Sequence, residues 1–249
     1  MERASVPVFT APPAPFHDGL GERRHVTDPT GNGTAEILCV HGELAAVPSF
    51  EFALRERVSR LANFRHGCFG RVRGVERLND RDATLAVVSD HVAGIRLSDL
   101  LKAGEQDTPL DINSALFLIR QLVPAVGALH EHARDAAHGA LGPERIVVTP
   151  RAVPIIVEYV MGSALEQLRF SHERYWAEVG VPLPRSAGLP RFDQRADIMQ
   201  IGMVALALVL GRLVREDEFP SRLGEVLASA WAVSARGGFE PLPAGLRAW

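Results

Sequence analysis

The chain has 249 residues, of which 47% are hydrophobic, so it can form one large domain or two lobes around a substantial core. Its net charge of −3 argues against a nucleic-acid partner, because phosphate backbones are bound by an excess of basic residues. The two cysteines, Cys39 and Cys68, cannot build a disulfide framework or a four-ligand zinc site. Since the N-terminus also lacks the apolar segment of a secretory signal, we expect a reduced, cytoplasmic location.

The first 95 residues show the pattern of strands with a single helix. Residues 1–18 contain three prolines between positions 12 and 15, and we expect them to form a flexible lead-in. The segment 31–45 has a Gly-Asn-Gly turn followed by an apolar run, which predicts a strand, and an apolar, β-branched segment at 83–94 predicts another. Apolar residues at helical spacing over 49–66 predict a helix between them.

From residue 96 onward the pattern becomes mainly helical. The apolar run at 198–211 is shorter than the roughly 20 residues that span a bilayer, so we expect a buried helix and no membrane insertion. The predicted elements, in order, are a short helix within 96–104 with Ser98 as its cap, a long amphipathic helix over 111–134, a strand hairpin over 145–160, and helices over 197–211 and 221–235.

Four stretches in this order resemble the protein-kinase fold in its bacterial Ser/Thr-kinase-like form. They are "FRHGCFGRVRGVE" at 64–76, "LAVVSDHVAGIRLSDLL" at 85–101, the segment 113–158 with "HGALGPERIVV", and "DQRADIMQIGMVALALVLGR" at 193–212. The resemblance implies an α+β, two-lobed kinase-like fold, with a small β-rich N-lobe over 19–95 and a larger, mainly helical C-lobe over 96–249. It also implies that the chain stops inside a helix at Trp249, so that the C-lobe is incomplete and further domains follow.

The resemblance places unsuitable residues where a kinase performs its chemistry. Ala140 falls at the position of the catalytic base, Gly142 at that of the loop lysine and Arg145 at that of the metal-binding asparagine. Glu158 falls at the position of the metal-binding aspartate. Alanine cannot accept a proton, and an arginine would repel Mg²⁺. An alternative base motif at Asp135 would lose the Pro-Glu signature of this loop. We therefore expect no catalytic residue in this loop.

The N-lobe is similarly depleted of phosphate-binding residues. The resemblance places His41 near the strand lysine and Arg57 at the position of its glutamate partner, and no G-x-G-x-x-G loop precedes them. A degenerate nucleotide cleft would be lined by His41, Ser89, Asp90, Arg145 and Glu158.

The residues that hold the large lobe of the kinase-like fold together are retained. The resemblance gives His138 a hydrogen bond to backbone, and it makes Asp197 an acceptor for backbone N–H groups of the loop. We also predict an ion pair between Arg145 and Glu158 that closes the metal position, the alternative being that Arg145 turns to solvent.

Two hypotheses follow. In the first, the chain is a pseudokinase that has no cofactor, binds a protein partner and acts as a regulatory module in a larger bacterial protein. That protein is either cytoplasmic or membrane-anchored with this part in the cytoplasm. In the second, it is a Ser/Thr protein kinase or another ATP-dependent phosphotransferase with remodelled residues, in which Glu158 holds Mg²⁺ beside ATP. No other metal site is expected.

Overall fold

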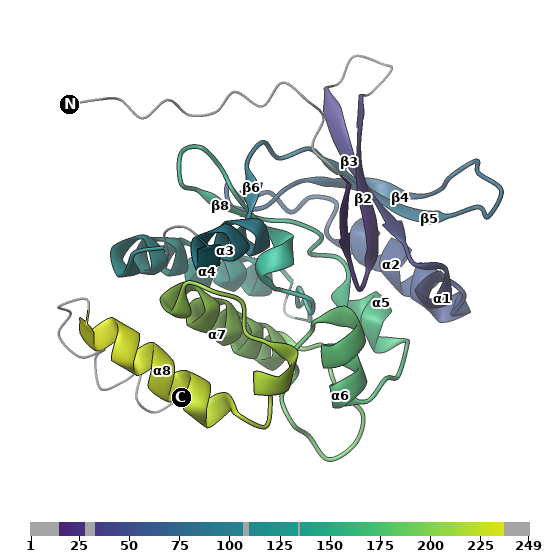
Figure 1. Cartoon of the computed structure of the whole chain (residues 1–249). Helices are drawn as coiled ribbons and strands as arrows, with labels where there is room; N and C mark the ends of the chain where they lie inside the picture. Colours follow the sequence, from purple (N-terminus) through teal and green to yellow (C-terminus); the bar gives the residue numbers. More distant parts are fainter. Residues whose placement is uncertain (1–14, 28–32, 107–109, 134, 237–249) are drawn as a thin grey trace.

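A computed structural model describes residues 15–27, 33–106, 110–133 and 135–236. A small lobe built on a β-sheet lies above a larger helical lobe (Figure 1), which confirms the predicted α+β, two-lobed architecture. Residues 237–249, which include the helix expected to stop at Trp249, lie outside the described residues.

The small lobe contains an antiparallel sheet in the order β1-β2-β3-β5-β4. Its strands are β1 (Phe16–Asp18), β2 (Gly21–Thr27), β3 (Thr34–Val40), β4 (Val72–Arg77) and β5 (Leu85–Asp90). The strands at 34–40 and 85–90 confirm two predictions. The boundary at residue 18 was wrong, because Phe16–Asp18 is not a lead-in but the edge strand, in which Phe16 pairs with Arg23.

Two helices follow β3, the short α1 (Gly42–Ala45) and the longer α2 (Pro48–Arg60). Helix α2 is the predicted helix of this lobe, and it begins with Pro48 at its first position, where a missing N–H costs nothing. Phe50 and Leu54 are fully buried on its inner face, where they join a core that extends into the large lobe. Helix α2 therefore connects the sheet to the large lobe.

The large lobe holds the remaining elements. They are β6 (Ile95–Arg96), α3 (Leu97–Gln106), α4 (Ile112–His132), the 3₁₀ turn η1 (Pro143–Arg145), β7 (Ile146–Val148), β8 (Pro154–Ile156), α5 (Gly162–Glu166), α6 (His172–Arg174), the π-helical turn η2 (Tyr175–Val179), α7 (Gln194–Leu210), the 3₁₀ turn η3 (Glu216–Glu218) and α8 (Leu223–Arg236). Strands β7 and β8 pair antiparallel, which confirms the predicted hairpin.

Helices α4 and α7 pack against each other at the centre of this lobe. Each begins at an aspartate, Asp111 or Asp193, whose carboxylate accepts backbone N–H groups of the first turn. By length and composition alone α4 could cross a membrane. About a third of its apolar stretch, including Leu118, Leu122 and Leu129, is buried in the protein core, whereas Phe117 and Val123 are exposed.

Candidate functional site

The loop that precedes η1 is held by a single buried carboxylate. Asp197, at the start of α7, accepts the backbone N–H of His138 at 2.8 Å and that of Gly139 at 2.7 Å. His130 also contacts its Oδ2 atom through Nε2, at 2.8 Å. The Nε2 atom of His138 lies 3.0 Å from the carbonyl oxygen of Val157. The predicted supporting roles of Asp197 and His138 are thus confirmed.

Gln200, one turn further along α7, has a supporting role that the sequence analysis missed. Its Oε1 atom accepts the N–H of Leu141 at 2.8 Å, and its Nε2 atom donates to the carbonyl of Gly139 at 2.9 Å. The available signal was its spacing, because Gln200 lies three residues after Asp197 and therefore on the same helix face. Two side chains of α7 consequently fix the path of the loop.

The loop ends close to Glu158, which follows strand β8. Glu158 has a left-handed backbone (φ 59°), uncommon for a residue with a side chain, and only 2% of its surface is exposed. Both carboxylate oxygens accept hydrogen bonds from one guanidinium, that of Arg23 on β2. The Nε–Oε1 distance is 2.8 Å and the Nη2–Oε2 distance is 2.7 Å. This bidentate pair joins the small lobe to the large lobe.

Arg145 completes the cluster. Its Nε atom lies 3.6 Å from Oε2 of Glu158, which confirms the predicted ion pair although this distance is too long for a hydrogen bond. Its Nη2 atom is closer to another carboxylate, Asp18, at 2.7 Å, and Nη1 donates to the carbonyl of Ala140 at 3.1 Å. Arg23 also pairs with Asp18. We call Asp18, Arg23, Arg145 and Glu158 the charge network.

The charge network is neutral overall and almost completely buried. No side chain in it is more than 9% exposed. Burial on its own would raise the pKa of Asp18, but Arg145 and Arg23 outweigh burial and hold that pKa at about 2. Burial opposes ionisation of Glu158 in the same way, and Arg23 again prevails and lowers its pKa. The two carboxylates are therefore ionised and occupied by arginines.

This arrangement does not fit a magnesium ion with a nucleotide. Mg²⁺ needs free oxygen ligands in near-octahedral geometry, whereas both oxygens of Glu158 are bonded to Arg23. Arg145 adds a permanent positive charge next to Glu158. Ala140, to which the resemblance assigned the position of the base, is fully buried and presents only a methyl group.

The turn between β1 and β2 lies against the large lobe. Its two residues are Gly19 and Leu20, and Leu20 is completely buried. A Cβ atom on Gly19 would lie 1.9 Å from the carbonyl oxygen of Glu178, in turn η2 of the large lobe. The β1–β2 connection is thus a tight turn in direct contact with the large lobe.

Three residues of the expected nucleotide cleft do not join Arg145 and Glu158. His41 lies after the end of β3 and is exposed, and its Nε2 atom contacts the backbone oxygen of Asp18, at 3.1 Å. Ser89 lies on β5 beside Glu36, and Asp90 pairs with Arg73 at 2.5 Å. The cation that binds both oxygens of Glu158 is Arg23, which the resemblance did not single out.

Arg23 reaches Glu158 because of strand register. It pairs across the sheet with Leu38 of β3, and its side chain is on the buried face of β2. The sequence analysis missed Arg23 and Asp18 because it predicted neither β1 nor β2. A signal for Arg23 would have been available only after β2 was recognised, when an arginine on an inward-facing position would have required a partner.

The remaining acidic and basic candidates lie outside the charge network. Arg57 on α2 is buried, and its guanidinium nitrogens are 3.5 Å from the backbone oxygen of Asp135. The Asp135 side chain is exposed and pairs with Arg60 at 2.5 Å. Asp135 is therefore part of a surface ion pair, which gives no support to the alternative base motif.

Comparisons with known proteins agree on the fold. No family model matches the sequence. A probable serine/threonine-protein kinase of Dictyostelium discoideum is 27% identical over 141 residues, which is 56% of this chain but only 16% of that protein's length. The PknI kinase domain of Mycobacterium tuberculosis aligns with a TM-score of 0.61 and 17% identity, covering 90% of this chain and 94% of that one. The kinase domain of maize SIRK1, a sucrose-induced receptor kinase solved with AMP-PNP, aligns with a TM-score of 0.61 and 14% identity, covering 93% and 84%. The chain has a protein-kinase-like fold.

Proposed function

We propose that this chain is a pseudokinase, a kinase-like module that does not transfer phosphate and acts as a binding or regulatory domain. One observation carries the proposal: Arg23 occupies both oxygens of Glu158, the carboxylate at the metal position. Phosphoryl transfer depends on metal ions, a cation on the phosphates and a residue that orients the nucleophile. Here the carboxylate is paired with Arg23, and the residue at the base position is Ala140.

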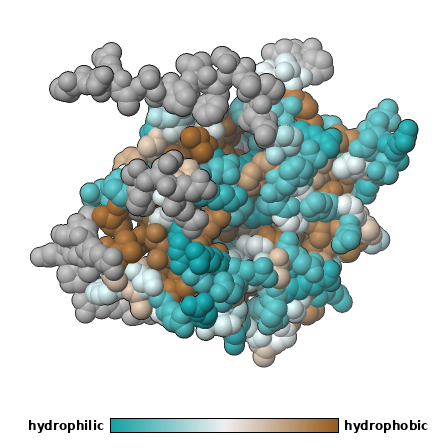
Figure 2. Space-filling view, viewed as in Figure 1, coloured by the Kyte–Doolittle hydropathy of each residue, from teal (hydrophilic) through white to brown (hydrophobic). Residues whose placement is uncertain are grey.

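The proposal extends to cofactor, partner and location. We expect no ATP or Mg²⁺ to be bound, a protein to be the partner, and the domain to lie in the cytoplasm. Exposed apolar side chains support a protein partner. Figure 2 shows hydrophobic surface on the side of the large lobe that carries α7 and α8. Exposed large hydrophobic residues on the helices of this lobe are Phe117 and Val123 on α4, Ile198 on α7, and Leu227, Trp231 and Val233 on α8.

The first experiment measures nucleotide binding. A thermal-shift titration of the full chain with ATP, with and without Mg²⁺ or Mn²⁺, should show no stabilisation at millimolar ATP. A ligand at 100 times its Kd would stabilise the protein by about 2.7 kcal/mol, which is easily seen. The same titration of Arg145→Ala tests whether the arginine side chain blocks a site that could otherwise bind a nucleotide. Nucleotide binding by that variant would show that a nucleotide cleft persists behind Arg145, contrary to the proposal.

The second experiment measures phosphate transfer from [γ-³²P]ATP to the chain itself and to generic protein acceptors. We expect no incorporation above that of a heat-denatured sample. Incorporation that disappears in Glu158→Ala would overturn the pseudokinase proposal and establish the alternative, a phosphotransferase with remodelled residues.

A further inference from the structure

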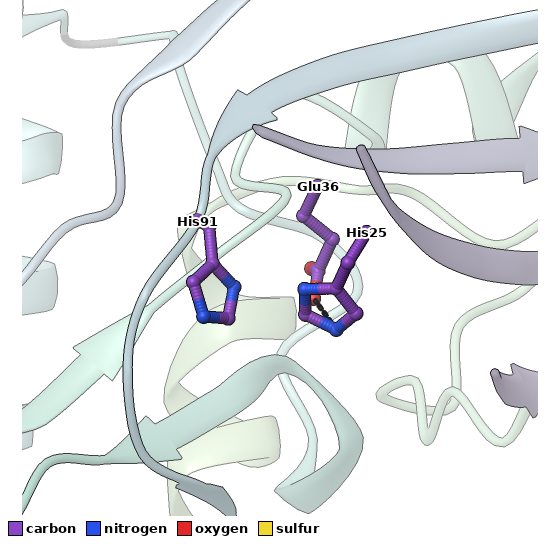
Figure 3. A group of neighbouring side chains, drawn as sticks. All are labelled: His25, Glu36 and His91. Atoms are coloured by element: carbon purple, nitrogen blue, oxygen red, sulfur yellow. Dashed lines mark ion pairs between the residues drawn. The ribbon is translucent and has the colours of Figure 1, made fainter. Parts of the chain in front are cut away.

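Three side chains that are not part of the charge network meet on the small lobe. They are His25 on β2, Glu36 on β3, and His91, which directly follows β5 (Figure 3). The sheet brings them together. His25 pairs with Glu36 across β2 and β3, and the backbone N–H of His91 donates to the carbonyl of Thr34, at 3.1 Å. We call these three side chains the His-Glu cluster.

The His-Glu cluster places two nitrogens and one carboxylate oxygen within 4.8 Å of one another. The Nε2 atom of His25 is 3.8 Å from Oε2 of Glu36. The imidazoles of His25 and His91 lie edge to face with their centroids 4.4 Å apart. In Figure 3 all three side chains point toward the same space. The side chains of His25 and Glu36 are 19% and 13% exposed, so an ion from solvent can reach them.

Both imidazoles have an unsatisfied nitrogen. The Nδ1 atoms of His25 and His91 are buried, and neither has a hydrogen-bond partner among the described residues. A buried polar atom without a partner is destabilising, and native proteins usually satisfy such atoms with protein, water or an ion. Burial, followed by the neighbouring His25, lowers the pKa of His91, which favours the neutral imidazole that binds metals.

Glu36 is held in position by a residue of the large lobe. Its Oε1 atom accepts from Nη2 of Arg96 at 2.7 Å, while Oε2 is the oxygen nearest to His25. Arg96 is itself fixed, since it donates to the carbonyl of Glu144 at 2.7 Å and lies over the ring of Phe16 at 4.6 Å. Such an outer partner orients a carboxylate ligand and leaves its second oxygen for a metal.

We propose that the His-Glu cluster binds one divalent transition-metal ion, with Zn²⁺ as the ion it fits best. Two imidazoles and a carboxylate are a common ligand set for zinc, whereas Mg²⁺ and Ca²⁺ require oxygen ligands. Water would take the fourth position. Zn–N bonds of about 2.0–2.1 Å place tetrahedral ligand atoms roughly 3.4 Å apart, so the side chains must close by about an ångström. The ion would tie β2 and β3 to the linker between the lobes.

The proposal is independent of the pseudokinase proposal, because none of its ligands belongs to the charge network. It is tested on the tag-free full chain after removal of metals with EDTA. Isothermal titration with ZnCl₂ should give one ion per chain with a micromolar or tighter Kd, and Zn²⁺ but not Mg²⁺ should raise the melting temperature. His25→Gln, Glu36→Gln and His91→Gln should each weaken Zn²⁺ binding at least tenfold. His17→Gln is the matched control, since it removes an exposed imidazole from β1, and it should bind as the unmodified chain does.

A measurement on the unmodified chain covers the case in which a variant fails to fold. In a chain labelled with ¹⁵N-histidine, Zn²⁺ should shift the imidazole signals of two of the nine histidines. Loss of a shifted signal in His25→Gln or in His91→Gln assigns it. Failure of the unmodified chain to bind Zn²⁺ at 100 µM would overturn the proposal. So would an unchanged Kd in all three ligand variants, or shifts at other histidines only.

Discussion

Arg23 on β2 and Glu158 after β8 form a bidentate ion pair that joins the two lobes, with nitrogen–oxygen distances of 2.8 and 2.7 Å. An arginine matches a carboxylate with two parallel hydrogen bonds, which a lysine cannot do. Because both side chains are buried, the guanidinium keeps Glu158 ionised, and the carboxylate compensates the cost of burying the charge of Arg23. The pair consequently stabilises the closed arrangement of the lobes and removes a carboxylate from metal binding.

Replacing Arg23 by methionine should be strongly destabilising. The change leaves Glu158 buried with only the longer contact to Arg145, and breaking one side of a buried ion pair costs about 3–5 kcal/mol. Urea denaturation would measure this loss. The matched control is Arg24→Met, on the same strand, where the side chain is 56% exposed and pairs with Glu22. The control should change the free energy of unfolding by less than about 1 kcal/mol. Similar effects for the two variants would contradict the role given to Arg23.

Asp18 should make the stability depend on pH under acidic conditions. Its pKa falls from 3.8 to about 2 on folding, and one pKa unit corresponds to about 1.4 kcal/mol, so the stabilisation is about 2 kcal/mol. Because the pKa of the folded state is the lower one, this contribution is present above about pH 4 and is lost as the pH falls through 2.

The variant Asp18→Asn tests this dependence. It should be less stable than the unmodified chain at pH 6, and it should lose less stability between pH 5 and pH 2. Denaturation curves across that range give the slope. Asp82→Asn, in the exposed loop between β4 and β5, should keep the slope of the unmodified chain. An unaltered slope in Asp18→Asn would show that Asp18 is not held by the two arginines.

A methyl group on Gly19 should separate the β1–β2 turn from the large lobe. In Gly19→Ala the new Cβ would lie 1.9 Å from the carbonyl of Glu178, a backbone atom that cannot rotate away. We expect a loss of about 1–3 kcal/mol and faster amide hydrogen exchange in β1 and η2. Gly42→Ala is the control, because a Cβ there meets nothing within 4 Å. Unchanged exchange in Gly19→Ala would mean that the turn does not close the space between the lobes.

Restoring the loop residues alone should not create a kinase. The double variant Ala140→Asp, Arg145→Asn returns a base and a metal-binding amide to their positions, but Arg23 still occupies Glu158. Catalytic groups act as a unit, so a partial repair gains little. A [γ-³²P]ATP assay should therefore show no transfer. Measurable transfer would show that the small lobe holds ATP and that Arg23 yields to Mg²⁺.

The sequence by itself was sufficient to predict several helices of this protein and some contacts of the loop at His138. The periodicity of apolar residues predicted α4, and a continuous apolar run predicted α7, because each buries apolar side chains in the core. The resemblance to kinases predicted the hydrogen bonds from the loop at His138 to Asp197 and the ion pair between Arg145 and Glu158. These contacts join segments that are distant in the sequence, so the residues alone would not have predicted them without that resemblance.

Only the tertiary structure decided which cation reaches Glu158 and which side chains gather at the edge of the cleft. Strands β1 and β2 carry "FHD" and "GERRHVT", which lack the apolar alternation of a half-buried strand, so neither was predicted. Pairing between β2 and β3 then places Arg23 opposite Leu38 and His25 opposite Glu36. A shift of one residue would reverse the face of every side chain on β2. Arg23 is buried as an ion because Glu158 and Asp18 neutralise it there. The contact with Asp18 lies within the β1–β2 hairpin, whereas the contact with Glu158 requires the two lobes to be together.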